Sequence, residues 1–194
     1  MQTAFRPALT LFALITLLCG LAYPCLVNGI AQSVFPAQAN GSLLLRDGKV
    51  AGSVLIGQSF SSTGYFWSRP SATAPQPNNG LASGGSNLGP LNPALADAVR
   101  QRVAALRAAH PEQHGPIPAD LVTASASGLD PHLSPAAIEW QLERVAAERG
   151  RTKEELLALV PAHTKGPDWG VFGEPRVNVL TLNLALDERW PMRQ

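Results

Sequence analysis

The sequence ALTLFALITLLCGLAYPCLVNGI, residues 8–30, decides how the rest of this chain is organised. It carries no charged side chain, and the uncharged run around it extends from Pro7 to Leu45. A helix built from it is apolar on every side, whereas a helix in the core of a soluble protein has a polar face. A bilayer core needs about 20 such residues in a helix. The stretch therefore predicts a transmembrane helix over residues 8–30.

A cleaved secretory signal peptide is the alternative interpretation of this stretch. A signal peptide also begins with a basic residue, here Arg6, and an apolar run, and Ala37 and Ala39 are small residues at which a signal peptidase could cut. The apolar region before that site is unusually long for a signal peptide, which favours an uncleaved anchor. A cleaved chain would instead be a secreted binding module that begins at Asn40. Within the anchor, Pro24 predicts a kink near the outer end of the helix.

The charges around the predicted helix indicate its orientation. Arg6 precedes the helix, and no lysine or arginine follows it until Arg46. Because cytoplasmic flanks carry an excess of basic residues, residues 1–7 are predicted to be cytoplasmic and residues 31–194 extracytoplasmic. Without Arg6, 14 of the 15 basic side chains follow Leu45 together with all 14 acidic ones, so the outer domain is formally neutral. This balance argues against nucleic acid as a partner.

The outer domain is predicted to be a small α+β unit. Apolar runs on both sides of Asp47-Gly48 predict a β-hairpin over residues 42–56, because glycine accepts the positive φ of a tight turn. Residues 57–92 are rich in Gly, Ser, Pro and Asn and predict a long irregular loop. The cluster Tyr65-Phe66-Trp67 indicates that this loop is ordered, either as a surface loop fixed by buried aromatic residues or as a binding surface.

Helices and a further strand are expected in the rest of the domain. Capping residues followed by apolar residues at helical spacing predict three helices. They cover residues 93–110, residues 135–149 and, after a capping box at Thr152 and Glu155, residues 153–160. The third helix is expected to turn Leu156, Leu157 and Val160 toward the core. Alternating leucines from Leu180 to Leu186 predict a strand over residues 177–186, inside a sheet.

Motifs for catalysis or metal binding are missing from the sequence. No Gly-rich phosphate loop and no Asp-Lys-Thr-Gly phosphorylation sequence occurs. The spacing of His110 and His114 would suit a metal on a helix, but Pro111 disrupts that helix, which favours two solvated histidines over a zinc site. Asp130 and His132 could be a base and its orienting group, but no nucleophile is implied nearby. Neither an intrinsic enzyme nor a metal site is therefore expected.

Short blocks that occur in order along the whole chain indicate a family. They are Arg6-Pro7-Ala8-Leu9, Tyr23-Pro24, Gly57-Gln58, Tyr65-Phe66, Arg69-Pro70-Ser71-Ala72, Ser83-Gly84-Gly85-Ser86-Asn87, Leu121-Val122-Thr123-Ala124-Ser125-Ala126-Ser127-Gly128-Leu129-Asp130, Arg144-Val145-Ala146, Asn178-Val179-Leu180 and Leu182-Asn183-Leu184-Ala185-Leu186-Asp187. With these blocks the chain resembles the KdpC family, the C subunits of the Kdp potassium-transporting P-type ATPase. One departure is Asn78, where the family usually carries a tyrosine.

The resemblance implies an accessory subunit of a bacterial inner-membrane complex, with a single N-terminal transmembrane helix and a periplasmic domain. KdpA would select potassium, KdpB would hydrolyse ATP, and KdpF would complete the assembly. The family is also described as a catalytic chaperone that raises the affinity of KdpB for ATP. Contact with ATP, the only cofactor that the resemblance suggests, is attributed to a segment like Ser83-Gly84-Gly85-Ser86-Asn87.

The predicted orientation conflicts with a direct contact to ATP, because ATP is scarce outside the cytoplasm. One hypothesis is therefore that residues 57–92 and 122–130 form a contact surface over the extracellular mouth of KdpA. The other is a regulator that binds nucleotide directly. The candidate contact residues are Tyr65, Phe66, Arg69, Ser83, Gly84, Gly85, Ser86, Asn87, Thr123, Ser125, Ser127, Asp130 and Asp187.

Overall fold

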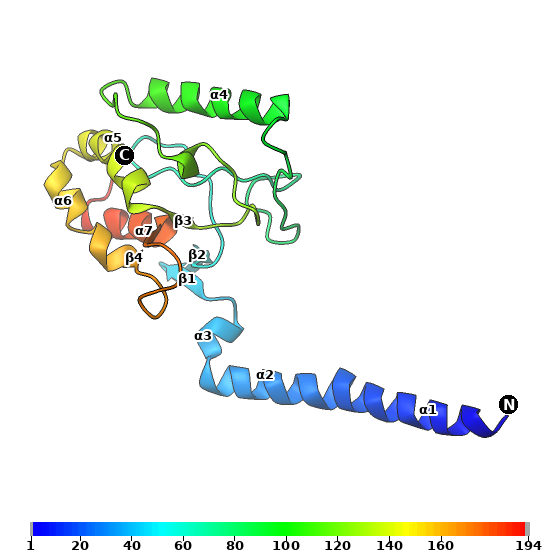
Figure 1. Ribbon diagram of the computed structural model, residues 1–194. Helices are drawn as coiled ribbons and strands as arrows, with labels where there is room; N and C mark the ends of the chain where they lie inside the picture. Colours follow the sequence, from blue (N-terminus) through cyan, green and yellow to red (C-terminus); the bar gives the residue numbers. More distant parts are fainter. Residues whose placement is uncertain (1, 193–194) are drawn as a thin grey trace. The chain divides into compact units, whose positions relative to one another are not determined.

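The structure of the protein is a computed structural model that describes residues 2–192. The chain divides into two compact units, Met1–Ala51 and Gly52–Gln194. The first unit contains the apolar helix and most of a hairpin, and the second, called the head, contains the remaining helices and strands (Figure 1).

The apolar stretch forms one long helix. α1 (Gln2–Leu17), η1 (Leu18–Ala22) and α2 (Tyr23–Val34) follow one another without a break. Within residues 4–34, a stretch of 18 residues has a mean hydropathy of 2.1, and none of this stretch is buried by the rest of the protein. Among the described residues this is the one helix that is long and apolar enough to cross a membrane.

Pro24 follows a π-helical turn. Proline has no backbone N–H, so Pro24 cannot donate to the carbonyl four residues earlier. The helix widens just before it: the N–H of Tyr23 donates to the carbonyl of Leu18, five residues earlier. Single π-helical turns of this kind change the hydrogen-bond register without ending a helix. The wide turn thus lets the helix continue through the proline.

A short helix follows, and then the hairpin that the sequence predicts. α3 (Pro36–Ala39) precedes β1 (Leu43–Arg46) and β2 (Lys49–Ser53), which form a two-stranded sheet. Asp47 and Gly48 connect the strands with φ angles of 51° and 73°. Positive φ at both central residues is the conformation that two-residue hairpin turns favour.

The core of the head is formed by α5 (Pro135–Arg149), α7 (Val179–Arg189) and the segments that pack on them. α5 begins and ends where its caps predict, because Ser134 accepts from the N–H of Ala137 and Gly150 has φ 61°. The large apolar side chains buried to at least 98% are Phe66, Leu133, Ile138, Val145, Leu156, Val177, Val179, Leu182 and Leu186.

A small antiparallel sheet lies beside these helices. It consists of β3 (His132–Leu133), β4 (Thr164–Lys165) and β5 (Arg176–Asn178), in the order β3–β5–β4. The pairs His132–Asn178 and Thr164–Val177 set its register. The prediction of a small α+β fold behind an apolar helix is therefore confirmed.

The predicted strand over residues 177–186 is wrong beyond its first two residues, because the chain turns into α7 at Val179. Asn178 caps this helix by accepting a hydrogen bond from the N–H of Thr181 at 3.1 Å. The buried positions are Val179, Leu180, Leu182, Asn183, Leu186 and Asp187, which share one helical face. Leu180, Leu182, Leu184 and Leu186 alternate as in a strand, but in α7 Leu184 is only partly buried and the polar Asn183 is buried instead.

The other predicted elements are present with different ends. α4 (Pro93–Ala109) begins at the predicted Asn92 cap. α6 (Lys153–Leu157) has the predicted capping box but is a single turn, followed by η3 (Val160–His163). Leu156 and Val160 are buried as predicted, but Leu157 is 48% exposed, so the prediction that Leu157 faces the core is wrong. Residues 57–92 contain no helix or strand, as expected, whereas the predicted second strand of the hairpin is shorter than expected, because β2 ends at Ser53.

Candidate functional site

The segment 65–67 crosses the head without a strand partner, and two buried side-chain amides replace one. The N–H of Phe66 donates to Asn183 Oδ1 at 2.9 Å, and its carbonyl accepts from Asn183 Nδ2 at 3.0 Å. Trp67 is paired in the same way with Gln141, at 2.8 Å and 3.2 Å. Because buried backbone groups need partners, these two amides hold the irregular segment on α7 and α5.

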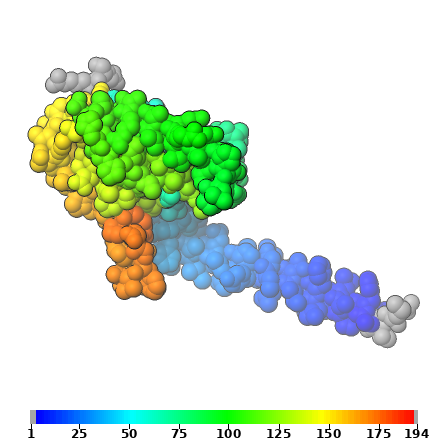
Figure 2. All heavy atoms as spheres, turned by 45° about the horizontal axis from the view of Figure 1, so that its top comes forward, coloured from blue at the N-terminus to red at the C-terminus, as the bar shows by residue number. Residues whose placement is uncertain are grey.

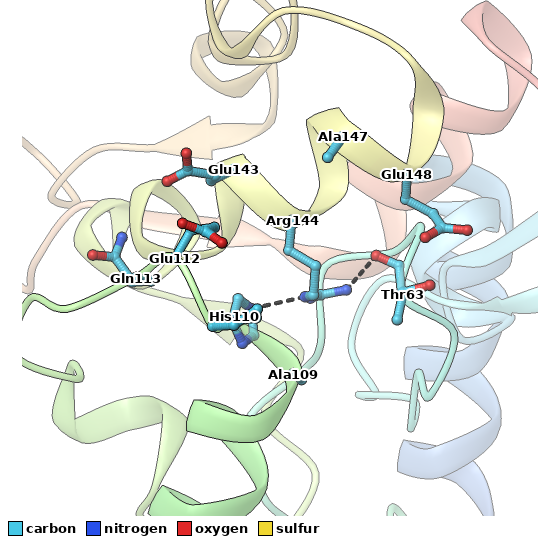
Figure 3. A pocket seen from close by; sticks show the side chains of 10 residues that line it. Thr63, Ala109, His110, Glu112, Gln113, Glu143, Arg144, Ala147 and Glu148 are labelled. Atoms are coloured by element: carbon cyan, nitrogen blue, oxygen red, sulfur yellow. Dashed lines mark hydrogen bonds between the residues drawn. The ribbon is translucent and has the colours of Figure 1, made fainter.

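Arg144 ties the same segment to the end of α4. It is 9% exposed, and its guanidinium donates to the carbonyls of Thr63 and Tyr65, to Gln141 Oε1 and to Nε2 of His110. Figure 3 shows Arg144 pointing from α5 toward His110, on one side of a cavity of about 370 Å³. Burial lowers the pKa of Arg144 to about 10, so the guanidinium stays charged at neutral pH. The groups that accept its hydrogen bonds are all neutral.

His110 is buried, which corrects the expectation that it is solvated. It is 3% exposed and lies between the rings of Trp67 and Trp140, with centroid distances of 5.8 Å and 4.4 Å. Since Nε2 accepts from Arg144, Nδ1 carries the hydrogen and donates to the carbonyl of Leu106 at 2.7 Å. Burial lowers the pKa of His110 to about 4, and the charge of Arg144 acts in the same direction.

A buried ion pair closes the other end of the segment. Arg149 donates to Asp187 Oδ1 at 2.9 Å, and their side chains are 0% and 8% exposed. The hydroxyl of Tyr65 donates to Asp187 Oδ2 at 2.8 Å, and Arg149 lies over the Tyr65 ring at 5.0 Å. Asp187, predicted to contact a partner, thus binds groups of its own chain.

A second group of contacts joins two loops that are distant in the sequence, and it is called the loop junction here. The N–H of Gly84 and the hydroxyl of Ser83 both donate to the carbonyl of Ser127, at 2.9 Å and 3.0 Å. On the other side, Ser71 donates to the carbonyl of Gly128 at 2.7 Å. The two blocks predicted to form one surface are therefore in contact.

Two glycines make this close approach possible. A Cβ at Gly85 would lie 2.9 Å from the carbonyl oxygen of Ala126, closer than side-chain carbons approach backbone. Gly128 has φ 67°, and a Cβ there would lie 2.5 Å from the carbonyl oxygen of Gly84. Gly84 itself has open space within 4 Å. Only one of the two glycines in the Ser-Gly-Gly motif is thus required by packing.

Arg69 and Asp130 connect the loop junction to β3. Arg69 donates to the carbonyl of Thr123 at 3.2 Å and to Asp130 at 3.1 Å. Burial acts to raise the pKa of Asp130, but hydrogen bonds from the side chain and backbone of His132 and from Arg69 outweigh it and hold that pKa below its usual value. The ionised carboxylate of Asp130 therefore holds Arg69 and the start of β3 together.

The predicted site residues fall into two groups that the structure does not unite. Ser83, Gly84 and Gly85 meet residues 125–128, whereas Tyr65, Phe66 and Asp187 belong to the buried contacts of α7. Ser86 and Asn87 are exposed beside the junction, and Asn87 has φ 52°. Within residues 2–192, no group of three or more His, Cys, Asp or Glu side chains is arranged to hold a metal ion.

Sequence reasoning missed the polar side chains that organise the head, namely His110, Gln141, Arg144, Arg149 and Asn183. A signal for some of them was present. Gln141 and Arg144 are three residues apart on the face of α5 that also buries Ile138 and Val145. Polar residues inside an otherwise apolar helical face indicate buried hydrogen bonds.

Comparison with known proteins identifies the family. Residues 5–188 match the family described as "KdpC: K+-transporting ATPase, c chain". The chain belongs to the KdpC family. It is 63% identical over 187 residues to the potassium-transporting ATPase KdpC subunit of Variovorax paradoxus (strain S110). The alignment covers 96% of this chain and 97% of that relative.

Two further KdpC subunits agree with this assignment. The subunit of Dechloromonas aromatica (strain RCB) is 59% identical over 96% of this chain and 98% of its own length. The subunit of Polaromonas naphthalenivorans (strain CJ2) is 60% identical over 99% and 98%. The resemblance seen in the sequence is thus confirmed, and the chain is a membrane-associated subunit of a potassium-transporting ATPase.

Proposed function

We propose that this chain is a non-catalytic accessory subunit that works together with KdpA, KdpB and KdpF. Its apolar helix spans the inner membrane with residues 1–7 in the cytoplasm, and the head is periplasmic. There the head stabilises the assembly and raises the affinity of KdpB for ATP from a distance, without binding ATP itself.

The observation that carries this proposal is the loop junction. A Ser-Gly-Gly segment that cradles a phosphate offers free backbone N–H groups. Here the N–H of Gly84 donates to Ser127, and Gly85 is packed against Ala126. The motif therefore has a structural explanation that needs no nucleotide, and it creates a shaped surface where two loops meet.

A periplasmic head can act on a cytoplasmic nucleotide site only through a coupling free energy. The head must bind one conformation of the transport subunits more tightly than another, and the conformation that it favours must bind ATP more tightly. A coupling of about 1–3 kcal/mol corresponds to a 5- to 150-fold change in ATP affinity. By reciprocity, ATP would tighten the binding of the chain to the complex by the same factor.

A direct nucleotide-binding regulator is the second candidate. Ser86 and Asn87 are exposed at the end of the motif, and the left-handed φ of Asn87 occurs in backbone nests that bind anions. This candidate requires the head to be on the cytoplasmic side.

Two measurements distinguish these functions. The first is equilibrium dialysis of radiolabelled ATP against the purified full-length chain, where we expect no retention at millimolar ATP. The second is the KM for ATP of the complex assembled with and without the chain, where we expect a higher KM without it. Saturable ATP retention by the isolated chain, or an unchanged KM, would overturn the proposal.

A further inference from the structure

The loop between β4 and β5 exposes a cluster of apolar side chains at its end. Trp169, Val171 and Phe172 are 92%, 78% and 63% exposed, and the two rings are in edge-to-face contact at 6.0 Å. Residues 169–173, called the aromatic tip here, belong to the orange segment after β4 that projects from the head in Figures 1 and 2. Large apolar side chains clustered on a projection indicate a binding function.

The backbone of the loop that carries the aromatic tip is closed on itself. The N–H of Asp168 donates to the carbonyl of Phe172 at 2.8 Å, and the N–H of Phe172 donates back to that of Asp168 at 3.0 Å. Gly170 and Val171 donate to the carbonyls of Pro167 and Asp168. With these groups paired inside the loop, the tip can leave water at a low cost in unsatisfied hydrogen bonds.

Ion pairs at the base fix the direction of the tip relative to the sheet. The carboxylate of Asp168 contacts Lys165 in β4 at 2.7 Å and Arg176 in β5 at 3.0 Å. It thus connects both strands from which the loop emerges. The exposed Glu174 balances the remaining charge, so the base carries two positive and two negative side chains in total.

We propose that the aromatic tip inserts into the interfacial layer of the membrane that holds the apolar helix. Tryptophan prefers this layer, and lysine and arginine at the base can stay among the head groups. The helix of residues 4–34 keeps the head close to lipid, so insertion of the tip is an intramolecular step with a high effective concentration. A few apolar side chains, too weak as a sole anchor, then suffice as a second one.

This second anchor restricts how the head turns about its connection to the helix. Because the base is electrically balanced, insertion depends on apolar burial, and neutral phosphatidylcholine supports it as well as anionic lipid does. The inference is independent of the side of the membrane on which the head lies, and therefore of the proposed function.

The test is tryptophan fluorescence of the full-length chain in phosphatidylcholine nanodiscs with acyl chains brominated near the head group. The chain has four tryptophans, so the contribution of Trp169 is the difference between wild type and Trp169→Phe. We expect bromination to quench at least half of this difference emission. A matched pair of double variants tests the cause: Val171→Ser with Phe172→Ser should abolish the quenching, whereas Leu81→Ser with Leu91→Ser, at side chains 99% and 96% exposed, should not.

Two results would overturn the inference. One is an absence of bromine quenching of Trp169 in both the isolated chain and the assembled complex. The other is protection of Trp169 from aqueous acrylamide only in the complex, still without bromine quenching, which would assign the tip to a protein surface.

Discussion

Arg144 donates its Nε hydrogen to Nε2 of His110 at 2.7 Å, and both side chains are buried. The pair works only while the imidazole is neutral, because a protonated His110 would have no lone pair to accept and would place a second positive charge beside the guanidinium. The contact joins the end of α4 to the middle of α5, so the protonation of one histidine bears on the packing of the head.

The stability of the head should therefore fall in mild acid. In the unfolded chain His110 has a pKa of about 6.5, and in the folded head about 4. Between these values the unfolded state binds more protons, so the free energy of unfolding is highest above pH 6.5 and decreases as the pH falls toward 4. The part due to His110 is up to roughly 3 kcal/mol.

Denaturant unfolding of the full-length chain in detergent, followed by tryptophan fluorescence from pH 4 to 7, measures this. His110→Phe keeps the aromatic contacts but should lose much of the pH dependence and, with Arg144 Nε unpaired, roughly 1–3 kcal/mol of stability at pH 7. His114→Phe, at an exposed position, is the control. Equal pH profiles for wild type and His110→Phe would show that this contact is not the titrating element.

Removing one partner of the buried ion pair should be costly. Arg149→Met removes a buried cation that contacts Asp187, and a loss of about 3–5 kcal/mol in unfolding free energy is expected. Arg100→Met breaks a pair with Asp97 whose side chains are 75% and 54% exposed, and should cost about 0–1 kcal/mol. Similar losses for the two variants would contradict the assigned role of burial.

The loop junction predicts opposite outcomes for two adjacent glycines. Gly85→Ala forces a Cβ against Ala126 and should destabilise the head by roughly 1–3 kcal/mol. It should also reduce the amount of the chain that copurifies with the complex. Gly84→Ala meets open space and should leave both quantities nearly unchanged. If the motif instead served a phosphate, Gly84→Ala would impair ATP-dependent activity while leaving the unfolding curve intact.

The amide that pairs with Phe66 should be as important as an apolar core residue. Asn183→Leu preserves size but leaves the N–H and carbonyl of Phe66 unpaired, and a loss of roughly 2–5 kcal/mol is expected. Asn92→Ala, which removes one exposed helix cap, should cost about 1 kcal/mol. Thermal unfolding of the two variants ranks them, and a milder effect for Asn183→Leu would show that the segment is held by apolar contacts alone.

Local signals in the sequence were enough for much of this fold. The apolar helix, the Asp47-Gly48 hairpin and the caps at Ser134 and Thr152 depend on residues within one turn or one strand of each other. The strand prediction for residues 177–186 was wrong because the spacing of the leucines fits the period of a strand as well as that of a helix. Only Asn178, as a helix N-cap, favours the helix.

The candidate site was harder to predict, because it consists of contacts between distant segments. The blocks around Ser83 and Ser127 came from the family resemblance, and the structure brings them together. No pattern in the neighbouring sequence indicates that Asn183 pairs with Phe66 or that His110 accepts a hydrogen bond from Arg144. Such pairings are visible only after the helices have packed.

The most direct test of the central claim is the side of the membrane on which the head lies. Ser86 is exposed and lies beside the loop junction, so Ser86→Cys in a chain whose Cys19 and Cys25 are replaced by alanine offers one labelling site. With a membrane-impermeant maleimide applied to intact cells with a permeabilised outer membrane, we predict full labelling of the head. Labelling that appears only after lysis of the inner membrane would place the head in the cytoplasm and contradict the account.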